Sequence, residues 1–442
     1  MKYIKNFSQI AKTKERKILL KILEVGIKSV SPKNIFPKKI KIEDKNLIVL
    51  NKKFDLKKFR KIYFIGIGKM ANSSYFVLKR IFKKFDFACI LDPSIKKSNL
   101  KNKNLKIYKV SHPFVKEINL KATKTVLKLA QKVKEDDLII FLISGGGSAS
   151  LSFPLIDLNS YNKIFEVLTK KGAQIKEINT LRKHLDLVKG GGLAKIFFPG
   201  TIISLIISDV IGNDLSFIAS GPTIYDKTSI LDAKNLLKKY GLEKKFKKIK
   251  FLETPKEKRY FKKVHNFLIL SNKDALLAMK KEAKDFGLKV KIFSDKIQGN
   301  VKEVAKKILS LKSKGLLIGG GETTVEIKGK GKGGRNQELC LWILKDLKEN
   351  QTFLSFASDG LDFYKAAGAI VDFKTKKKAK KLKLSVDKYL KNNDSFHFFL
   401  KTGDLIFSEK TGINIADLYL FLKSPISFKR SKSHFHKHIN HF

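Results

Sequence analysis

Short apolar runs alternate with longer amphipathic stretches along most of the chain. Three such runs, Ile62–Gly66, Leu138–Ile143 and Ile202–Ile207, are rich in β-branched residues, and a turn containing glycine or aspartate follows each. A run that is apolar at every position is typical of a strand covered by helices on both faces of a sheet. The alternation of such strands with helices predicts an α/β domain with a mostly parallel sheet.

A lysine-rich stretch at residues 238–263 interrupts this pattern with Pro255 and little apolar periodicity, and the alternation resumes beyond it. We therefore predict two α/β domains, residues 1–245 and residues 262–424. In the second we expect strands at 267–270, 289–293, 316–318 and 323–328, and helices at 275–286 and 301–311.

The chain has 442 residues, of which 43% are hydrophobic, so it can bury two substantial cores. No apolar run approaches the roughly 18 residues of a membrane span, and we expect no membrane association. The N-terminal segment lacks the apolar stretch of a secretory signal, and Cys89 and Cys340 stand far apart. A cytoplasmic protein without disulfides is the expectation.

The charge balance is strongly basic, with 93 lysines and arginines against 40 acids and a formal charge of +53. Only seven of the cations are arginine, the residue best suited to bidentate recognition of bases and phosphates. The lysines are spread over the whole chain, which argues against a specific nucleic-acid site. Such a surface still attracts small anionic substrates.

Several glycine-rich turns follow predicted strands, where α/β sheets place their ligands. The turn Gly66–Lys69 matches neither a Walker A loop nor a complete GxGxxG motif, and a tight structural turn explains it as well as an anion site does. The turn Ser144–Ala149 has three consecutive glycines flanked by serines, which favours a phosphate-binding nest over a plain turn.

Charged residues accompany the next two predicted elements. Residues 178–185 read as a helix carrying Arg182, Lys183 and His184 and closed by the glycines at 190–192. Asp209 and Asp214 follow the strand at 202–207. Carboxylates there are typical of a Mg²⁺ ligand or a base for a hydroxyl group, whereas helix capping is the structural alternative for Asp214.

In the second domain, Gly319–Thr324 and Gly329–Glu338 are the glycine-rich segments, and the latter ends at a predicted helix start with Arg335. Because arginine is rare in this chain, we expect Arg335 to clamp a phosphate or a carboxylate. The tail at 425–442 contains four histidines, for which a solvated end is favoured over metal binding.

Taken in order, these segments resemble the glycerate 2-kinases of the MOFRL family from about residue 10 to residue 423. The resemblance implies an N-terminal Rossmann-like three-layer sandwich, a smaller C-terminal α/β domain and an active site in the cleft between them. It implies transfer of the ATP γ-phosphoryl group to the 2-hydroxyl of D-glycerate, with Mg²⁺ or another divalent metal. Monomer and homodimer both remain open.

The resemblance also assigns site residues. Lys69, Asp209 and Arg335 are the expected catalytic residues, with Asp209 also the expected metal ligand. The expected substrate- and nucleotide-binding residues are Gly66, Gly68, Ser144, Gly145, Gly146, Gly147, Ser148, Arg182, Lys183, His184, Asp214, Gly320, Gly321, Glu322, Thr323, Asn336, Gln337 and Asp359.

Three segments depart from the family pattern. Ser111-His112-Pro113 replaces Gly-His-Pro, residues 358–368 lack the usual Gly-Pro-Thr-Asp, and residues 409–414 replace Gly-Pro-Thr-Gly-Thr-Asn. Two other functions remain as alternatives, a basic nucleic-acid-binding protein and a nucleotide-dependent dehydrogenase built on Gly66–Gly68.

Overall fold

The computed structural model describes residues 3–95, 103–243, 246 and 249–423. The chain folds as two compact units. The large unit contains Val30–Ser271 and Gly412–Ile415, and the small unit contains the chain up to Ser29, Asn272–Thr411 and the chain from Ala416. The histidine-rich tail lies outside the described residues. Among the described helices, none is both long and apolar enough to cross a membrane.

The large unit is built on a six-stranded sheet in the order β6-β5-β4-β7-β8-β9, and every pair of neighbours is parallel. This arrangement confirms the mostly parallel sheet expected from the apolar runs. The strands are β4 (Lys61–Ile67), β5 (Phe87–Asp92), β6 (Leu105–Lys109), β7 (Asp137–Ile143), β8 (Thr201–Ile207) and β9 (Val264–Leu270).

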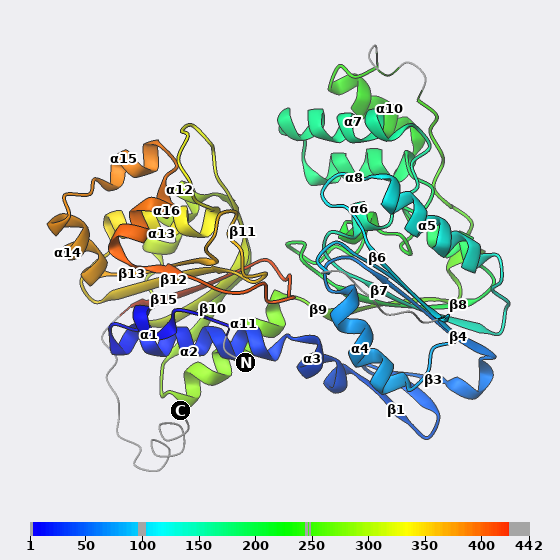
Figure 1. The fold of residues 1–442 in the computed structure, drawn as a ribbon, viewed down its shortest axis with the longest axis horizontal. Helices are drawn as coiled ribbons and strands as arrows, with labels where there is room; N and C mark the ends of the chain where they lie inside the picture. The colour runs from blue at the N-terminus through cyan, green and yellow to red at the C-terminus, as the bar shows by residue number, and fades with distance from the viewer. Residues whose placement is uncertain (1–2, 96–102, 244–245, 247–248, 424–442) are drawn as a thin grey trace. The chain divides into compact units, whose positions relative to one another are not determined.

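Helices cover both faces of this sheet, as Figure 1 shows. On β4, Ile65 and Ile67 enter the core beneath α5, whereas Phe64 packs against Tyr75 of α4 on the opposite face. The helices of the large unit are α3 (Pro32–Lys39), α4 (Ala71–Phe82), α5 (Glu117–Ala130), α6 (Gly147–Ser150), α7 (Leu158–Lys170), α8 (Ile175–His184), α9 (Gly192–Ile196) and α10 (Ile230–Lys239). A small antiparallel sheet of β1 (Ile40–Glu43), β2 (Asn46–Val49) and β3 (Lys52–Asp55) lies between α3 and β4 in the sequence.

The small unit contains a mixed sheet in the order β10-β11-β15-β12-β13-β14, in which only β10 and β11 run parallel. Its strands are β10 (Val290–Asn300), β11 (Gly315–Thr324), β12 (Gln351–Ala357), β13 (Gly368–Asp372), β14 (Leu405–Ile406) and β15 (Asp417–Lys423). Its helices are α1 (Phe7–Ile10), α2 (Lys14–Ser29), α11 (Asn272–Asp285), α12 (Val301–Ser310), α13 (Arg335–Asp346), α14 (Phe373–Lys381), α15 (Val386–Lys391) and α16 (Ser395–Thr402).

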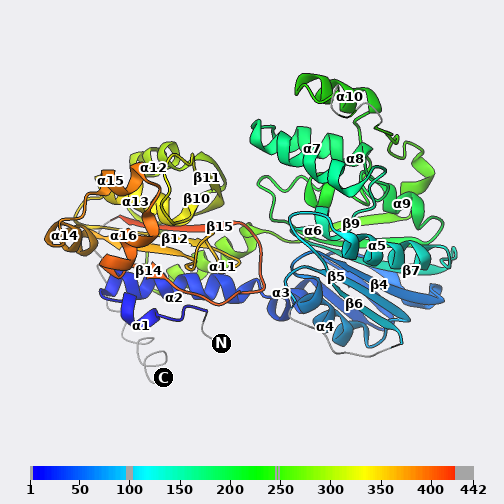
Figure 2. The same cartoon turned by 45° about the horizontal axis from the view of Figure 1, so that its top comes forward.

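The units differ from the predicted boundaries in two places. Strand β9 completes the large sheet, so the break falls at Ser271 and not within residues 246–261. The first 29 residues belong to the small unit, where α2 lies beside α11 (Figure 2). Gly26 permits this close packing, because a Cβ atom there would lie 2.4 Å from the Cγ of Met279.

Two local predictions were also wrong. The expected strand at 323–328 ends at Thr324, and beyond it the side chain of Asn393 accepts hydrogen bonds from the backbone N–H groups of Lys328 and Gly329. The glycines at 190–192 do not close α8, which ends at His184. Gly191 instead adopts a left-handed conformation (φ 85°) as the N-cap of α9.

A buried ion network joins α2 to the rest of the small unit. The guanidinium of Arg16, which is 0% exposed, donates two hydrogen bonds to Asp372 at 2.7 and 2.8 Å and one to Asp404 at 2.8 Å. It donates another to Thr375 at 2.7 Å. Burial alone would lower the pKa of Arg16, but the two carboxylates outweigh burial and raise it. The cation therefore stays charged inside the unit.

We predict that Arg16→Ala destabilises the small unit by about 3–5 kcal/mol, because two buried carboxylates would lose their cation. Arg16→Lys should recover only part of the loss, since an ammonium cannot form the bidentate pair. Thermal and denaturant unfolding would measure the effect, with exposed Lys17→Ala on the same helix as the control. A loss below about 1 kcal/mol for Arg16→Ala would contradict the prediction.

Candidate functional site

The turn after β4 passes directly over the end of β7. Gly68 has φ 100°, and a Cβ atom there would lie 2.5 Å from the backbone oxygen of Ser144. The backbone N–H of Lys69 donates to the oxygen of Gly145 at 2.9 Å, and that of Met70 donates to the Ser144 hydroxyl at 3.2 Å. These amides are therefore occupied by protein. The turn Gly66–Lys69 acts as a tight structural turn that presents the Lys69 side chain.

The turn after β7 retains open amide donors. Gly146 has φ 77°, which favours glycine, and it is the N-cap of the short helix α6. Within the described part of the chain, the backbone N–H groups of Gly145 and Gly146 donate to no protein acceptor. Lys69 lies beside them, its Cγ 3.4 Å from the position of a Cβ at Gly146. Two free amides next to a lysine form a small anion-binding surface.

Asp209 lies against the same turn, just beyond β8. The side-chain amide of Asn414 donates to the Asp209 Oδ2 at 2.9 Å. A Cβ atom at Gly145 would lie 2.1 Å from that oxygen and 2.4 Å from the Asn414 nitrogen. Burial raises the pKa of Asp209, while the charge of Lys69 and the hydrogen bond from Asn414 pull it back down.

His112 borders the glycine turn from a third segment of the chain. A Cβ atom at Gly146 would lie 3.1 Å from the His112 Cδ2 and 3.4 Å from its Nε2. Although part of the side chain is exposed, the protein packed around the ring and the charges of Lys69 and Arg182 lower the pKa of His112 to about 4. The imidazole is therefore neutral at physiological pH.

His112 and Asn414 are residues of this site that motif analysis did not select. Both stand in segments recognised only for their departure from the family pattern, at 111–113 and 409–414. The signal that could have found them is the His-Pro pair and the asparagine retained at the end of an otherwise altered segment.

The cations of α8 have different surroundings. The guanidinium of Arg182 lies over the ring of Phe165, 4.6 Å from its centroid, and its positive charge helps to lower the pKa of His112. Lys183 forms a buried ion pair with Asp226 at 2.9 Å. The ring nitrogens of His184 lie 2.9 Å from the Leu252 carbonyl oxygen and 3.1 Å from the Thr228 hydroxyl. The side chains of Lys183 and His184 therefore bind partners inside the large unit. Of these three side chains, only Arg182 lies near the anion-binding surface.

Two further predicted residues bind neighbouring polar groups. The Ser148 hydroxyl is 2.9 Å from that of Ser220, which donates to Asn179 at 2.7 Å and so ties α6 to α8. Asp214 is exposed and accepts a hydrogen bond from the backbone N–H of Ser216 at 2.9 Å within the loop, but it does not cap the next helix, whose N-cap is Phe217.

The remaining predicted residues lie in the small unit, where Arg335 is held by two carboxylates. Its guanidinium donates two hydrogen bonds to Asp417, at 2.6 and 3.0 Å, and forms an ion pair with Glu322 at 2.7 Å. Burial alone would lower the pKa of Arg335, but these carboxylates outweigh burial and raise it. Both carboxylates bound by Arg335 belong to the protein itself, and clamping of a ligand anion by Arg335 stays a prediction.

Asn336 and Gln337, at the start of α13, both bind the carboxylate of Asp362 through their backbone N–H groups, at 3.1 and 2.9 Å. Burial and the nearby Asp417 raise the pKa of Asp362 to about 6. Asp359 accepts a hydrogen bond from the backbone N–H of Leu361 at 3.1 Å.

The glycine-rich segments of the small unit have structural partners. In Gly329–Gly334, the amides of Lys330 and Lys332 donate to the side chains of Asn392 and Asp394. In β11, a Cβ atom at Gly321 would lie 2.1 Å from the backbone oxygen of Ile297. The last two predicted residues, Gly320 and Thr323, are buried in β11. These glycines allow close backbone packing, and the phosphate nest remains a prediction only for the turn after β7.

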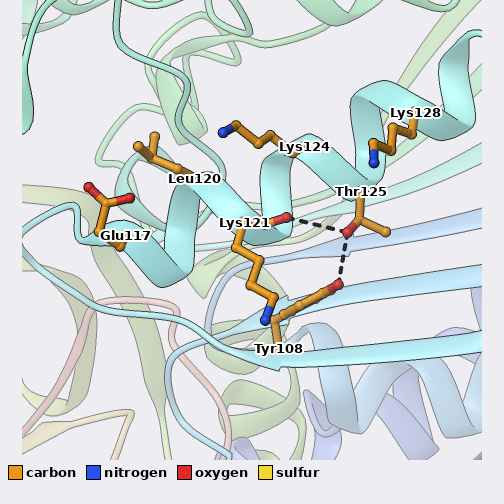
Figure 3. Close-up of a pocket in the computed structure, with 7 residues that line it drawn as sticks. All are labelled: Tyr108, Glu117, Leu120, Lys121, Lys124, Thr125 and Lys128. Atoms are coloured by element: carbon orange, nitrogen blue, oxygen red, sulfur yellow. Dashed lines mark hydrogen bonds between the residues drawn. The ribbon is translucent and has the colours of Figure 1, made fainter.

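Two cavities of the large unit lie apart from the glycine turns. One of about 330 Å³ is lined by Tyr108 of β6 and by side chains of α5, including Lys121 and Lys124 (Figure 3). The other, of about 850 Å³, is lined by residues of α8, α10 and the loop at 214–228, and it includes Lys183 and Asp214. In the described part of the chain, no group of three or more His, Cys, Asp or Glu side chains is placed to hold a metal ion.

Two family models match the chain. Residues 18–251 match a domain of unknown function, DUF4147, and residues 315–417 match the MOFRL family. The first match covers the anion surface around Lys69 and Asp209, and the second covers Arg335 and its partners.

Curated relatives and solved structures extend the match to nearly the whole chain. The glycerate 2-kinase of Pyrococcus horikoshii is 35% identical over 95% of this chain and 99% of its own length. The D-glycerate 2-kinase of Thermotoga maritima is 38% identical over 72% of this chain and 80% of its own length. A crystal structure of the Thermotoga maritima glycerate kinase superimposes with a TM-score of 0.80 at 33% identity, covering 92% of this chain and 99% of that one. The chain belongs to the MOFRL family of glycerate 2-kinases.

Proposed function

We propose that the protein transfers the γ-phosphoryl group of ATP to the 2-hydroxyl of D-glycerate, giving 2-phosphoglycerate and ADP. Membership of the glycerate 2-kinase family supports this reaction. The observation that carries the proposal is the cluster at the ends of β4, β7 and β8. There, Lys69 and two free backbone amides lie beside a carboxylate whose pKa is raised.

Phosphoryl transfer depends mainly on positioning the reactants and neutralising charge. In this proposal, Lys69 and the amides of Gly145 and Gly146 bind phosphate oxygens. The glycerate 2-oxygen attacks the γ-phosphorus, the bond to the β-phosphate oxygen breaks, and the hydroxyl proton passes to Asp209. A raised pKa suits a carboxylate that must accept a proton near neutral pH.

Arg335 is proposed to bind an anionic group of a substrate by exchanging one of its partners. The Asp417 side chain is 1% exposed and fixes the guanidinium, whereas the Glu322 side chain is 43% exposed. An exposed ion pair contributes little stability, so a carboxylate or phosphate can replace Glu322 at a small cost. The guanidinium keeps its orientation because the pair with Asp417 stays intact.

Asp209 fits the role of base better than that of a resident metal ligand. A resident metal site needs several oxygen or nitrogen ligands around the ion, and in the described part of the chain no group of three or more His, Cys, Asp or Glu side chains is placed to hold one. Mg²⁺ in kinases is held largely by the substrate phosphates, so we propose that ATP carries the ion, and we derive no step through it.

The other two functions have less support. Lysines without a reading motif explain attraction to polyanions in general but no specific nucleic-acid site. In the Gly66–Gly68 turn, Gly68 allows the backbone to pass close to Ser144. The turn lacks the third glycine of a dinucleotide-binding motif, which argues against a dehydrogenase.

We predict that Lys69→Ala lowers kcat/KM for glycerate about 10²- to 10³-fold, because the lysine neutralises charge that develops during transfer. Exposed Lys79→Ala on α4 is the matched control and should retain wild-type activity. Phosphorus NMR of the product from ATP, Mg²⁺ and D-glycerate would identify 2-phosphoglycerate. Wild-type protein that yields only 3-phosphoglycerate, or no phosphoglycerate, would refute the proposed reaction.

Asp209→Asn should separate activity from stability. The pKa of Asp209 is higher in the folded protein than in the unfolded chain, where it is about 4. The protonated side chain therefore stabilises the folded protein below a pH of about 4. This stabilisation is lost as the pH rises through the folded pKa. The variant escapes this loss and should be more stable than wild type at pH 7 but not below pH 4. Its kcat should fall about 10²-fold or more. Thermal unfolding at both pH values would check the sign, and a variant less stable than wild type at pH 7 would contradict it.

A further inference from the structure

The segment Gly412–Ile415 belongs to the large unit, although the residues before and after it in the sequence belong to the small unit. Its contact with Asp209 is the hydrogen bond from the Asn414 amide at 2.9 Å. Both side chains are partly buried. A short segment from the far end of the sequence therefore supplies a hydrogen-bond donor to the proposed base.

Gly145 provides the space for this hydrogen bond. A Cβ atom at that position would lie 2.1 Å from the accepting oxygen and 2.4 Å from the donating nitrogen. Real Cβ atoms do not approach other atoms so closely, so any residue other than glycine must displace one partner. Gly145 is not among the glycines with a positive φ, so its value here lies in the absent side chain and not in backbone freedom.

The hydrogen bond also favours the ionised form of Asp209. Burial favours the protonated form, while the Asn414 amide and the Lys69 ammonium favour the ionised form. His112 borders the same turn but has a pKa of about 4 and carries no charge near neutral pH. The backbone N–H of Asp209 itself, the Lys69 ammonium and the Asn414 amide thus all oppose burial, and Asn414 is the side chain that donates a hydrogen bond to a carboxylate oxygen.

We propose that Asn414 is a positioning residue for the proposed base: its amide occupies Oδ2, holds the carboxylate in place and leaves Oδ1 to accept the substrate proton. This inference rests on the proposed function. It assigns Asn414 no contact with substrate, so its effect must appear through Asp209.

The test is the pH profile of kcat/KM for Asn414→Leu, which preserves the approximate shape of the side chain but removes the donor. Loss of a hydrogen bond to a charged group should raise the apparent pKa of the acid limb by about one unit. It should lower kcat/KM about tenfold at pH values below the acid limb, with a smaller effect above it, and leave the KM for glycerate within about threefold. Asn414→Gln retains an amide and should recover part of the activity, and Ile413→Val controls for packing of the segment. An unchanged acid limb in Asn414→Leu would overturn the proposal.

Gly145→Ala is a second and independent probe, because it adds a methyl group at the hydrogen bond while the backbone conformation suits alanine. It should shift the acid limb in the same direction as Asn414→Leu. Combining the two substitutions should shift it no further, since both remove the same contact. Additive shifts would contradict the assignment.

A stability cycle distinguishes failure of this inference from failure of the proposed reaction, because it needs no activity. At pH 7, Asp209→Asn should raise the melting temperature more in the Asn414→Leu background than in wild type, since the unsupported carboxylate is costlier to ionise. Equal increases would overturn the role of Asn414. If the two increases in melting temperature differ but the wild-type protein makes no 2-phosphoglycerate, the proposed reaction is wrong, whereas the effect of Asn414 on Asp209 is supported.

Discussion

The candidate site depends on backbone approaches that only glycine permits. Gly68 lets the turn after β4 cross the end of β7, and Gly145 leaves space for the hydrogen bond between Asp209 and Asn414. In a parallel sheet, the carboxyl ends of neighbouring strands meet at one edge, so turns from β4, β7 and β8 compete for the same volume. Removing side chains from the turns is what allows a lysine, a carboxylate and free amides to share that volume.

The two units manage buried charge in different ways. In the small unit, Arg16 and Arg335 each bind two carboxylates, and the fork of a guanidinium suits such bidentate pairing. In the large unit, Asp209 has no arginine partner among the described residues and relies on Lys69 and one amide. The first arrangement keeps the guanidinium groups charged, whereas in the second burial raises the pKa of the carboxylate, which suits a group that must accept a proton.

Much of the fold could be predicted from local pattern. Apolar runs identified β4, β7 and β8, because a strand buried on both faces needs apolar residues throughout. The errors arose where distant residues decide the outcome. Beyond the end of β11, the backbone amides of Lys328 and Gly329 bind Asn393, which is more than 60 residues away in the sequence. Helix α2 joins the small unit because Gly26 fits against Met279 and Arg16 against Asp372 and Asp404, partners more than 250 residues away.

The sequence by itself determined the α/β class and the glycine turns, because strand periodicity and turn composition are local properties, and its resemblance to a known family indicated the kind of chemistry. Only the tertiary structure decided which charged residues are available. Lys183 and His184 look like ligands in the sequence, yet Asp226 and the Leu252 carbonyl hold them inside. In the sequence, nothing distinguishes Asn414 from other polar residues. Its proposed role follows from the tertiary structure, in which its side-chain nitrogen lies 2.9 Å from the Oδ2 of Asp209. A hydrogen bond acts over about 3 Å, and the order of residues along a chain does not specify which atoms come that close.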